Sequence, residues 1–140
     1  MPFHNAELFP LSANINIAGN LEIGGCDTVS MAQEFGTPLY VYDESTIRSM
    51  AKTYLHEFSS RYPDTTVAYA SKAFLNKEMS RIADEEGLSL DVVSGGEIAV
   101  AMSTGFPAER MYFHGNNKTL QELSEAINVG IGTIVVDGFQ

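Results

Sequence analysis

Residues 65–97 read TTVAYASKAFLNKEMSRIADEEGLSLDVVSGGE, and this stretch decides the fold that the sequence predicts. It opens with a run rich in β-branched and aromatic residues (65–71) and returns to a second apolar run at 88–94. Between the two runs lies an amphipathic segment in which Asn76 can cap the start of a helix and Gly87 can end it. The stretch therefore predicts a strand, a helix and a second strand in succession.

The same unit recurs toward the end of the chain. Further β-rich runs occupy 110–114 and 132–137, so the four predicted strands begin about twenty-two residues apart. Residues 94–97 and 119–122 each have the spacing of a helix capping box. Strands that alternate with helices favour parallel pairing with right-handed crossovers. We expect the first half of a (β/α)8 barrel, which needs roughly 250 residues when complete, and the alternative is an open doubly wound sheet.

Upstream of these units the pattern changes. Residues 44–62 predict a long amphipathic helix that Asp43 can cap. A strand is predicted at 38–42 (PLYVY) and a short helix at 29–35, whereas residues 1–20 show no period and predict an arm or loop. The apolar positions of the long helix are spaced to share one face; they are Ile47, Met50, Ala51, Tyr54, Leu55 and Phe58.

Composition excludes several classes of function. The 140 residues include 18 acidic and 8 basic side chains, a net charge of −10, which argues against a nucleic-acid partner. The single cysteine, Cys26, fits a reducing compartment. The sequence has no signal peptide, no apolar run that could span a bilayer and no metal-ligand spacing among its three histidines. We therefore expect a soluble cytoplasmic protein that binds no metal and no membrane.

Candidate site residues follow from the predicted strands, because functional groups of parallel α/β folds gather where strands end. Lys72 follows the first strand between apolar neighbours, and a partly desolvated lysine amine suits Schiff-base chemistry. The alternative is a lysine stem on the rim with its ammonium in water. Asp91, inside an apolar strand, needs a partner such as Lys72 or loop amides. His114 ends the third strand and could face a cofactor ring or serve a structural role.

Four segments in this order resemble one enzyme family. They are GTPLYVYDE (36–44), YASKAF (69–74), LDVVSGGE (90–97) and HGNNKT (114–119). Together they resemble bacterial diaminopimelate decarboxylases, which belong to the alanine-racemase-like group of pyridoxal-phosphate barrel enzymes. Ornithine and arginine decarboxylases of the same fold share the segment around Lys72. The resemblance extends from Leu21 to the last residue.

The resemblance implies a carboxy-lyase of lysine biosynthesis that converts the small amino acid meso-diaminopimelate to L-lysine. Pyridoxal 5'-phosphate would be held by Lys72, with Asp91 and His114 close to it. Residues 1–43 would be an arm and a strand of a separate β-domain, and residues 44–140 the first half of the cofactor-binding (β/α)8 barrel. The full-length form would be a homodimer.

Relatives carry the remaining cofactor and substrate contacts further along their chains, so we expect these 140 residues to be inactive alone. Three alternatives stay open at this point. One is an ornithine- or arginine-type decarboxylase of the same fold. The second is a non-catalytic relative that acts as an interaction module, and the third is a flavodoxin-like open domain.

Overall fold

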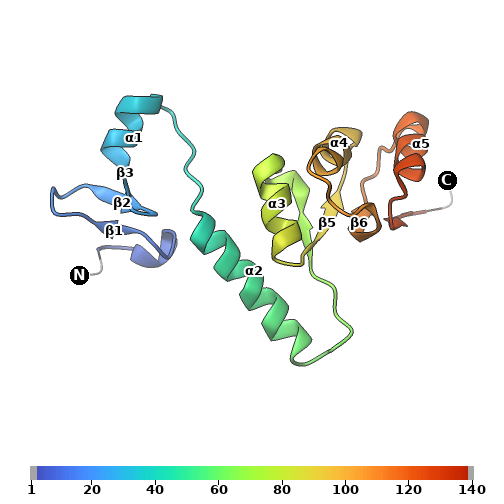
Figure 1. The fold of residues 1–140 in the computed structure, drawn as a ribbon, viewed down its shortest axis with the longest axis horizontal. Coiled ribbons are helices and arrows are strands. Elements are labelled where there is room, and N and C mark those ends of the chain that lie inside the picture. The colour runs from blue at the N-terminus through green and yellow to red at the C-terminus, as the bar shows by residue number, and fades with distance from the viewer. Residues whose placement is uncertain (1–2, 139–140) are drawn as a thin grey trace. The chain divides into compact units, whose positions relative to one another are not determined.

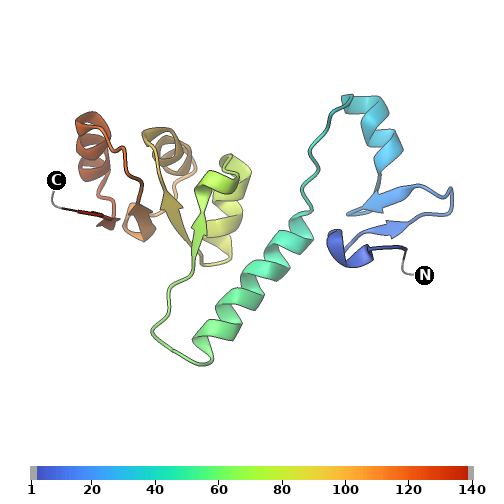
Figure 2. The same cartoon turned by 180° about the vertical axis from the view of Figure 1, so that it is seen from behind.

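A computed structural model of the protein describes residues 3–138, and these fall into two compact units (Figures 1 and 2). Unit 1 ends at Met50 and unit 2 begins at Ala51. No helix in the described part of the chain is long and apolar enough to cross a membrane.

Unit 1 is built on a small antiparallel sheet. After the 3-10 turn η1 (Ala6–Leu8) come β1 (Asn14–Ile15), β2 (Leu21–Ile23) and β3 (Cys26–Asp27), which pair in that order. The predicted arm or loop at residues 1–20 thus includes a strand. Strands of two or three residues are too short to show an alternating pattern in the sequence, and pairing alone defines them.

Two predicted helices of this region are confirmed. Helix α1 (Thr28–Phe35) starts at Asp27, whose Oδ1 accepts hydrogen bonds from the backbone amides of Val29 (2.9 Å) and Ser30 (3.0 Å). Helix α2 (Glu44–Ser59) starts at Asp43, whose Oδ2 accepts from the amide of Thr46 at 3.1 Å. Short acidic side chains at these positions satisfy amides that have no partner inside the helix.

The predicted strand at residues 38–42 is wrong. These residues are not in a strand, and no strand in the described part of the chain pairs with them. Leu39, Tyr40, Val41 and Tyr42 are all exposed. Their β-prone composition is a preference for a half-buried pleated surface, and a strand forms only where a neighbour supplies backbone hydrogen bonds.

Unit 2 confirms the repeated strand–helix units. Its four-stranded parallel sheet has the order β4-β5-β6-β7, and helices α3, α4 and α5 follow one another along it (Figure 1). The strands are β4 (Ala68–Ala70), β5 (Ser89–Val92), β6 (Met111–Phe113) and β7 (Thr133–Ile134). The helices are α3 (Lys77–Glu85), α4 (Gly95–Ser103) and α5 (Leu120–Val129), with 3-10 turns η2 (Ser71–Ala73) and η3 (Ala108–Arg110).

Side chains alternate between the two faces of this sheet. Leu90 and Val92 of β5 and Met111 and Phe113 of β6 have no exposed surface and pack with helix residues in one core. Each such burial stabilises the fold by about 1.5–3 kcal/mol. Asp91 lies between the two buried residues of its strand, so it belongs to the opposite face. One face of the sheet is therefore core, and the other carries the polar candidate.

Local signals punctuate the helices as predicted. Asn76 Oδ1 accepts from the amide of Met79 at 2.8 Å at the start of α3. Thr119 and Glu122 form a complete capping box at the start of α5. Gly130 ends α5 in the left-handed conformation (φ 78°), which glycine adopts without steric cost.

Candidate active site

Parallel strands direct their carboxyl ends to one edge of the sheet, so the turns after β4, β5, β6 and β7 share a rim. The register places Ala70 of β4 beside Asp91 of β5, and Asp91 beside Tyr112 of β6. Lys72 therefore lies two residues past the neighbour of Asp91. The predicted location of Lys72 at the rim agrees with the structure.

The predicted shelter of Lys72 is not observed. Lys72 and Ala73 are both exposed on the three-residue turn η2, although Ser71 of the same turn is buried. Within residues 3–138 the Lys72 amine makes no hydrogen bond and no ion pair. Its chemistry in this structure is that of an accessible primary amine at a strand end.

Asp91 contacts His114 and not Lys72, so the predicted Lys72–Asp91 pair is absent from the described residues. Asp91 Oδ1 lies 3.7 Å from His114 Nδ1, too far for a hydrogen bond and close enough for charge attraction when the ring is protonated. The same Oδ1 is buried and has no hydrogen-bond partner. The physical reason is position: Lys72 lies beyond the strand end, whereas His114 follows the strand next to β5.

His114 lies between two carboxylates. Its backbone amide donates to Val92 O at 2.8 Å, which fixes it at the end of β6. Its Nδ1 faces Asp91, and its Nε2 is 3.7 Å from Oδ1 of Asp137, which follows β7. The structure thus brings Asp91 and His114 together and adds Asp137, which the sequence-based set of site residues lacked. The signal for Asp137 was its place as the last residue of the fourth predicted strand.

The start of helix α4 is already occupied by the chain's own carboxylates. The amide of Gly95 donates to Glu122 Oε1 at 3.0 Å, and the amide of Val93 donates to Glu97 Oε2 at 2.7 Å. Ser94 Oγ accepts from the amide of Glu97 at 3.3 Å, so only one half of the predicted 94–97 capping box forms. The reciprocal bond shifts by one residue, from Ser94 to Val93.

Hydrogen bonds also set the charge of Glu122. The amide of Gly95, and after it the amide and hydroxyl of Thr119, lower the pKa of the Glu122 carboxyl below its ordinary value. The ionised carboxylate accepts all three bonds, whereas a protonated acid loses acceptor capacity. Glu122 thus joins the starts of two helices as an anion.

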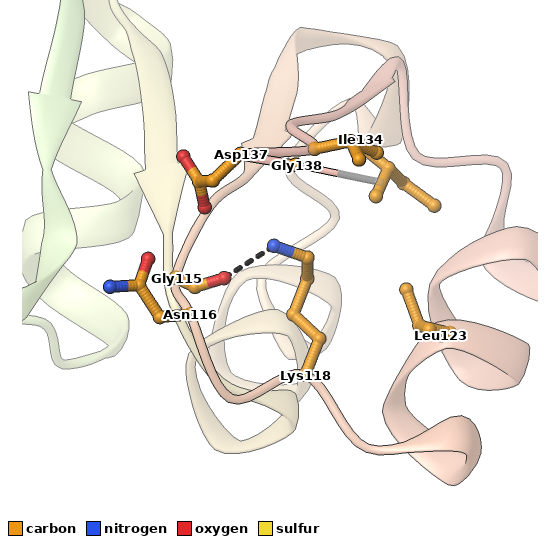
Figure 3. A pocket seen from close by; sticks show the side chains of 8 residues that line it. Gly115, Asn116, Lys118, Leu123, Ile134, Asp137 and Gly138 are labelled. Atoms are coloured by element: carbon orange, nitrogen blue, oxygen red, sulfur yellow. Dashed lines mark hydrogen bonds between the residues drawn. The ribbon is translucent and has the colours of Figure 1, made fainter. Parts of the chain in front are cut away.

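A pocket of about 470 Å³ opens beside this rim (Figure 3). The loop after β6 and the end of β7 line it, and Lys118 reaches across it to donate a hydrogen bond to Gly115 O. The Lys118 amine also lies 5.8 Å from the ring centroid of Phe113. Asp137 is shared between this pocket and the contact with His114, but Lys72 and Asp91 do not line it. The pocket is therefore a neighbour of the candidate site and not its centre.

Two unpartnered buried atoms suggest what the rim could hold. Ser71 Oγ and Asp91 Oδ1 are buried without hydrogen-bond partners, and Lys72 supplies an unpaired amine next to Ser71. Buried polar atoms are normally paired, so such exceptions indicate a missing ligand contact or a functional constraint. An aldehyde with polar substituents fits these groups, because the amine can react with the aldehyde and the two oxygens can bind the substituents. No cluster of three metal-binding side chains occurs in the described part of the chain.

Comparison with known proteins agrees with this chemistry. Residues 45–140 match the family described as pyridoxal-dependent decarboxylase, pyridoxal binding domain. The chain is 56% identical over 124 residues to a diaminopimelate decarboxylase of Bacillus subtilis (strain 168). The matched region covers 89% of this chain and 28% of that relative. The corresponding enzyme of Bacillus methanolicus is 52% identical over 128 residues, with 91% of this chain and 30% of the relative covered.

Solved structures give the same result for the fold. The diaminopimelate decarboxylase of M. jannaschii in co-complex with L-lysine matches with a TM-score of 0.83 at 35% identity, over 91% of this chain and 30% of that one. A lysine/ornithine decarboxylase of Vibrio vulnificus, 24% identical with a TM-score of 0.66 over 80% of this chain and 30% of that one, shares the fold. The chain spans less than a third of the length of these relatives. The chain belongs to the pyridoxal-dependent decarboxylase family, and its four parallel strands with the helices between them form part of the barrel that binds the cofactor in that family.

Proposed function

We propose that this chain serves in the pyridoxal-phosphate-dependent decarboxylation of meso-diaminopimelate to L-lysine, with Lys72 as the residue that bears the cofactor. The main observation that supports this proposal concerns Lys72. Its unpaired amine lies at the strand-end rim of a domain that matches the pyridoxal-binding family over residues 45–140. The substrate follows from the relatives that share 52–56% identity, which are named diaminopimelate decarboxylases. The matching structure with L-lysine supports a small amino acid as ligand.

The residues of the rim have separate roles in this proposal. Lys72 would hold the cofactor through its amine, and that amine would be set free when the amino group of the substrate takes its place. Pyridoxal phosphate, when bound, supplies a ring that takes up the electrons released as carbon dioxide leaves. Asp91 offers its unpartnered Oδ1 to a polar group in the site, and His114, whose Nδ1 lies 3.7 Å from the same oxygen, stands beside that group.

The proposal includes two properties of the whole protein. We infer that it functions as a homodimer in the cytoplasm, as the family resemblance implies. We also infer that the 140 residues alone do not turn over diaminopimelate, since they span 28–30% of the relatives' length. Sedimentation of the protein would check the first inference, and carbon dioxide release by the purified chain would contradict the second.

The role of Lys72 is tested by trapping. The purified chain is incubated with pyridoxal phosphate and reduced with borohydride, and labelled peptides are quantified by mass spectrometry. We expect label at Lys72 well above that at Lys77, the exposed lysine five residues further on. Lys72→Ala should abolish this label, and the matched control Lys77→Ala should leave it unchanged. Equal labelling of both lysines would contradict the proposal.

A further inference from the structure

The turn that carries Lys72 has little support of its own. Turn η2 (Ser71–Ala73) is three residues long, and Ala70, at its N-cap position, provides no side-chain cap. Short 3-10 turns have poorer hydrogen-bond geometry than α-helices. Since Lys72 is also exposed, the position of its amine depends on what fixes the backbone on both sides of the turn.

Tyr69 provides such a restraint. Its hydroxyl donates a hydrogen bond of 2.7 Å to the carbonyl oxygen of Phe74, in partly buried surroundings. The bond spans the whole turn, from the residue before Ala70 to the residue after Ala73. Lys72 therefore lies inside a loop of the chain that the Tyr69 side chain closes.

The other end of this restraint is rigid. Tyr69 is the central residue of β4, and in the parallel ladder it is the partner of Leu90, which has no exposed surface. The Tyr69 ring packs against the hydrophobic core. The phenol thus connects the Lys72 turn to the most buried strand of the sheet.

We propose that Tyr69 is a positioning residue that holds the Lys72 turn in the conformation that reacts with the cofactor aldehyde. This inference rests on the proposed role of Lys72. A positioned amine reacts faster than one on a mobile turn, because less orientational freedom is lost on reaching the reactive geometry. Tyr69→Phe removes the hydroxyl and keeps the ring, so packing in the core is preserved.

The experiment compares Tyr69→Phe with a control that loses a similar bond elsewhere. Ser80→Ala removes the 2.9 Å bond between Ser80 Oγ and Thr104 Oγ1, which joins α3 to the end of α4 and does not touch the turn. The full chain and both variants are incubated with pyridoxal phosphate, and the rate of borohydride-stable labelling at Lys72 is measured. Hydrogen exchange of the amides at 71–75 without cofactor provides a second readout.

We expect Lys72 to be labelled about five- to tenfold more slowly in Tyr69→Phe than in the unmodified chain, because the free energy of about one net hydrogen bond corresponds to that factor. The amides at 71–75 should also exchange faster in this variant. Ser80→Ala should match the unmodified chain in both measurements. Labelling of Tyr69→Phe at the unmodified rate, or equal slowing in Ser80→Ala, overturns the inference and leaves the role of Lys72 intact. If the unmodified chain shows no selective label at Lys72, the proposed function fails and the inference fails with it.

Discussion

The backbone amide of Gly95 donates to the carboxylate of Glu122 at 3.0 Å, across 27 positions of sequence. The bond joins the start of α4 to the start of α5, because Glu122 also closes the capping box with Thr119. A side chain at Gly95 would interfere: a Cβ there would lie 3.2 Å from Glu122 Cγ. The two rim turns that follow β5 and β6 are thus held together by one carboxylate.

Removing the charge of Glu122 should destabilise unit 2 in a pH-dependent way. The folded state lowers the pKa of this carboxyl below its ordinary value of 4.5, so its contribution to stability is fully present above pH 4.5. The contribution is lost as pH falls through the lower pKa of the folded state. We expect Glu122→Gln to reduce the denaturation midpoint at pH 7, with a difference from the unmodified chain that shrinks below pH 4.5.

Glu125→Gln is the matched control, because Glu125 makes an exposed bond with Gln121 on the same helix. Its denaturation midpoint should stay close to that of the unmodified chain at pH 7. A Glu122→Gln midpoint equal to that of this control would show that the link between α4 and α5 contributes nothing.

The bond between Gly95 and Glu122 also shows which features a sequence predicts. Caps formed by a side chain and an amide three residues ahead, as at Asp43, Asn76 and Thr119, could be predicted because both partners lie in one short stretch. The repeated strand–helix order was readable for the same reason. The partner of the Gly95 amide could not be predicted, because Glu122 belongs to the next strand–helix unit.

Two further differences between the predicted and the observed structure have the same physical origin. The run at 38–42 has strand-like composition, but whether a strand forms depends on a neighbour that the run itself does not specify. The sequence predicted where Lys72, Asp91 and His114 lie along their strands, because strand ends follow from periodicity. Which of them pair could not be predicted, because the contact of 3.7 Å between Asp91 and His114 depends on the register between β5 and β6.

Asp27 should stabilise unit 1 down to unusually low pH. The side-chain amide of Asn20, followed by the backbone amide of Ser30 and the side-chain amide of Asn16, lowers the pKa of Asp27 from 3.8 to about 2. The contribution is therefore complete above pH 3.8 and is lost as pH falls to about 2. In Asp27→Asn a single acceptor oxygen remains, and it cannot serve both the two asparagines and the two helix amides. We expect this variant to speed hydrogen exchange at Val29 and Ser30 at pH 5.

The difference in exchange between Asp27→Asn and the unmodified chain should vanish near pH 2. Glu34→Gln, an exposed change in the same helix, should leave the exchange rates at both pH values as they are. Persistence of the Asp27→Asn effect near pH 2 would mean that the asparagine side chain acts by distorting the loop and not by loss of charge.

Two glycines of unit 2 should respond to alanine with opposite signs. A Cβ at Gly132 would lie 2.0 Å from the carbonyl oxygen of Glu109, a backbone atom that cannot move aside without shifting the chain before β6. We expect Gly132→Ala to lower the free energy of unfolding by about 1–3 kcal/mol. In helix α4, a Cβ at Gly96 meets nothing closer than 3.8 Å, and Gly96→Ala should gain about 0.4–1 kcal/mol. Urea denaturation measures both changes. A Gly132→Ala chain as stable as the unmodified chain would contradict the close approach at Gly132, and a destabilised Gly96→Ala chain would contradict the open space at Gly96.

Asp91 allows a test that separates function from structure. Its Oδ1 is buried without a hydrogen-bond partner, and an unsatisfied charged group of this kind costs stability. If the carboxylate is kept for the cofactor site, Asp91→Asn should stabilise the cofactor-free chain by about 1 kcal/mol and weaken cofactor labelling at Lys72. Asp137→Asn is the matched control, since Asp137 faces the other nitrogen of His114 at the same 3.7 Å but is half exposed. It should change neither measurement much. A less stable Asp91→Asn chain that labels normally would assign Asp91 a structural role. A carboxylate needed only for folding affects the stability of the chain and not its labelling by the cofactor.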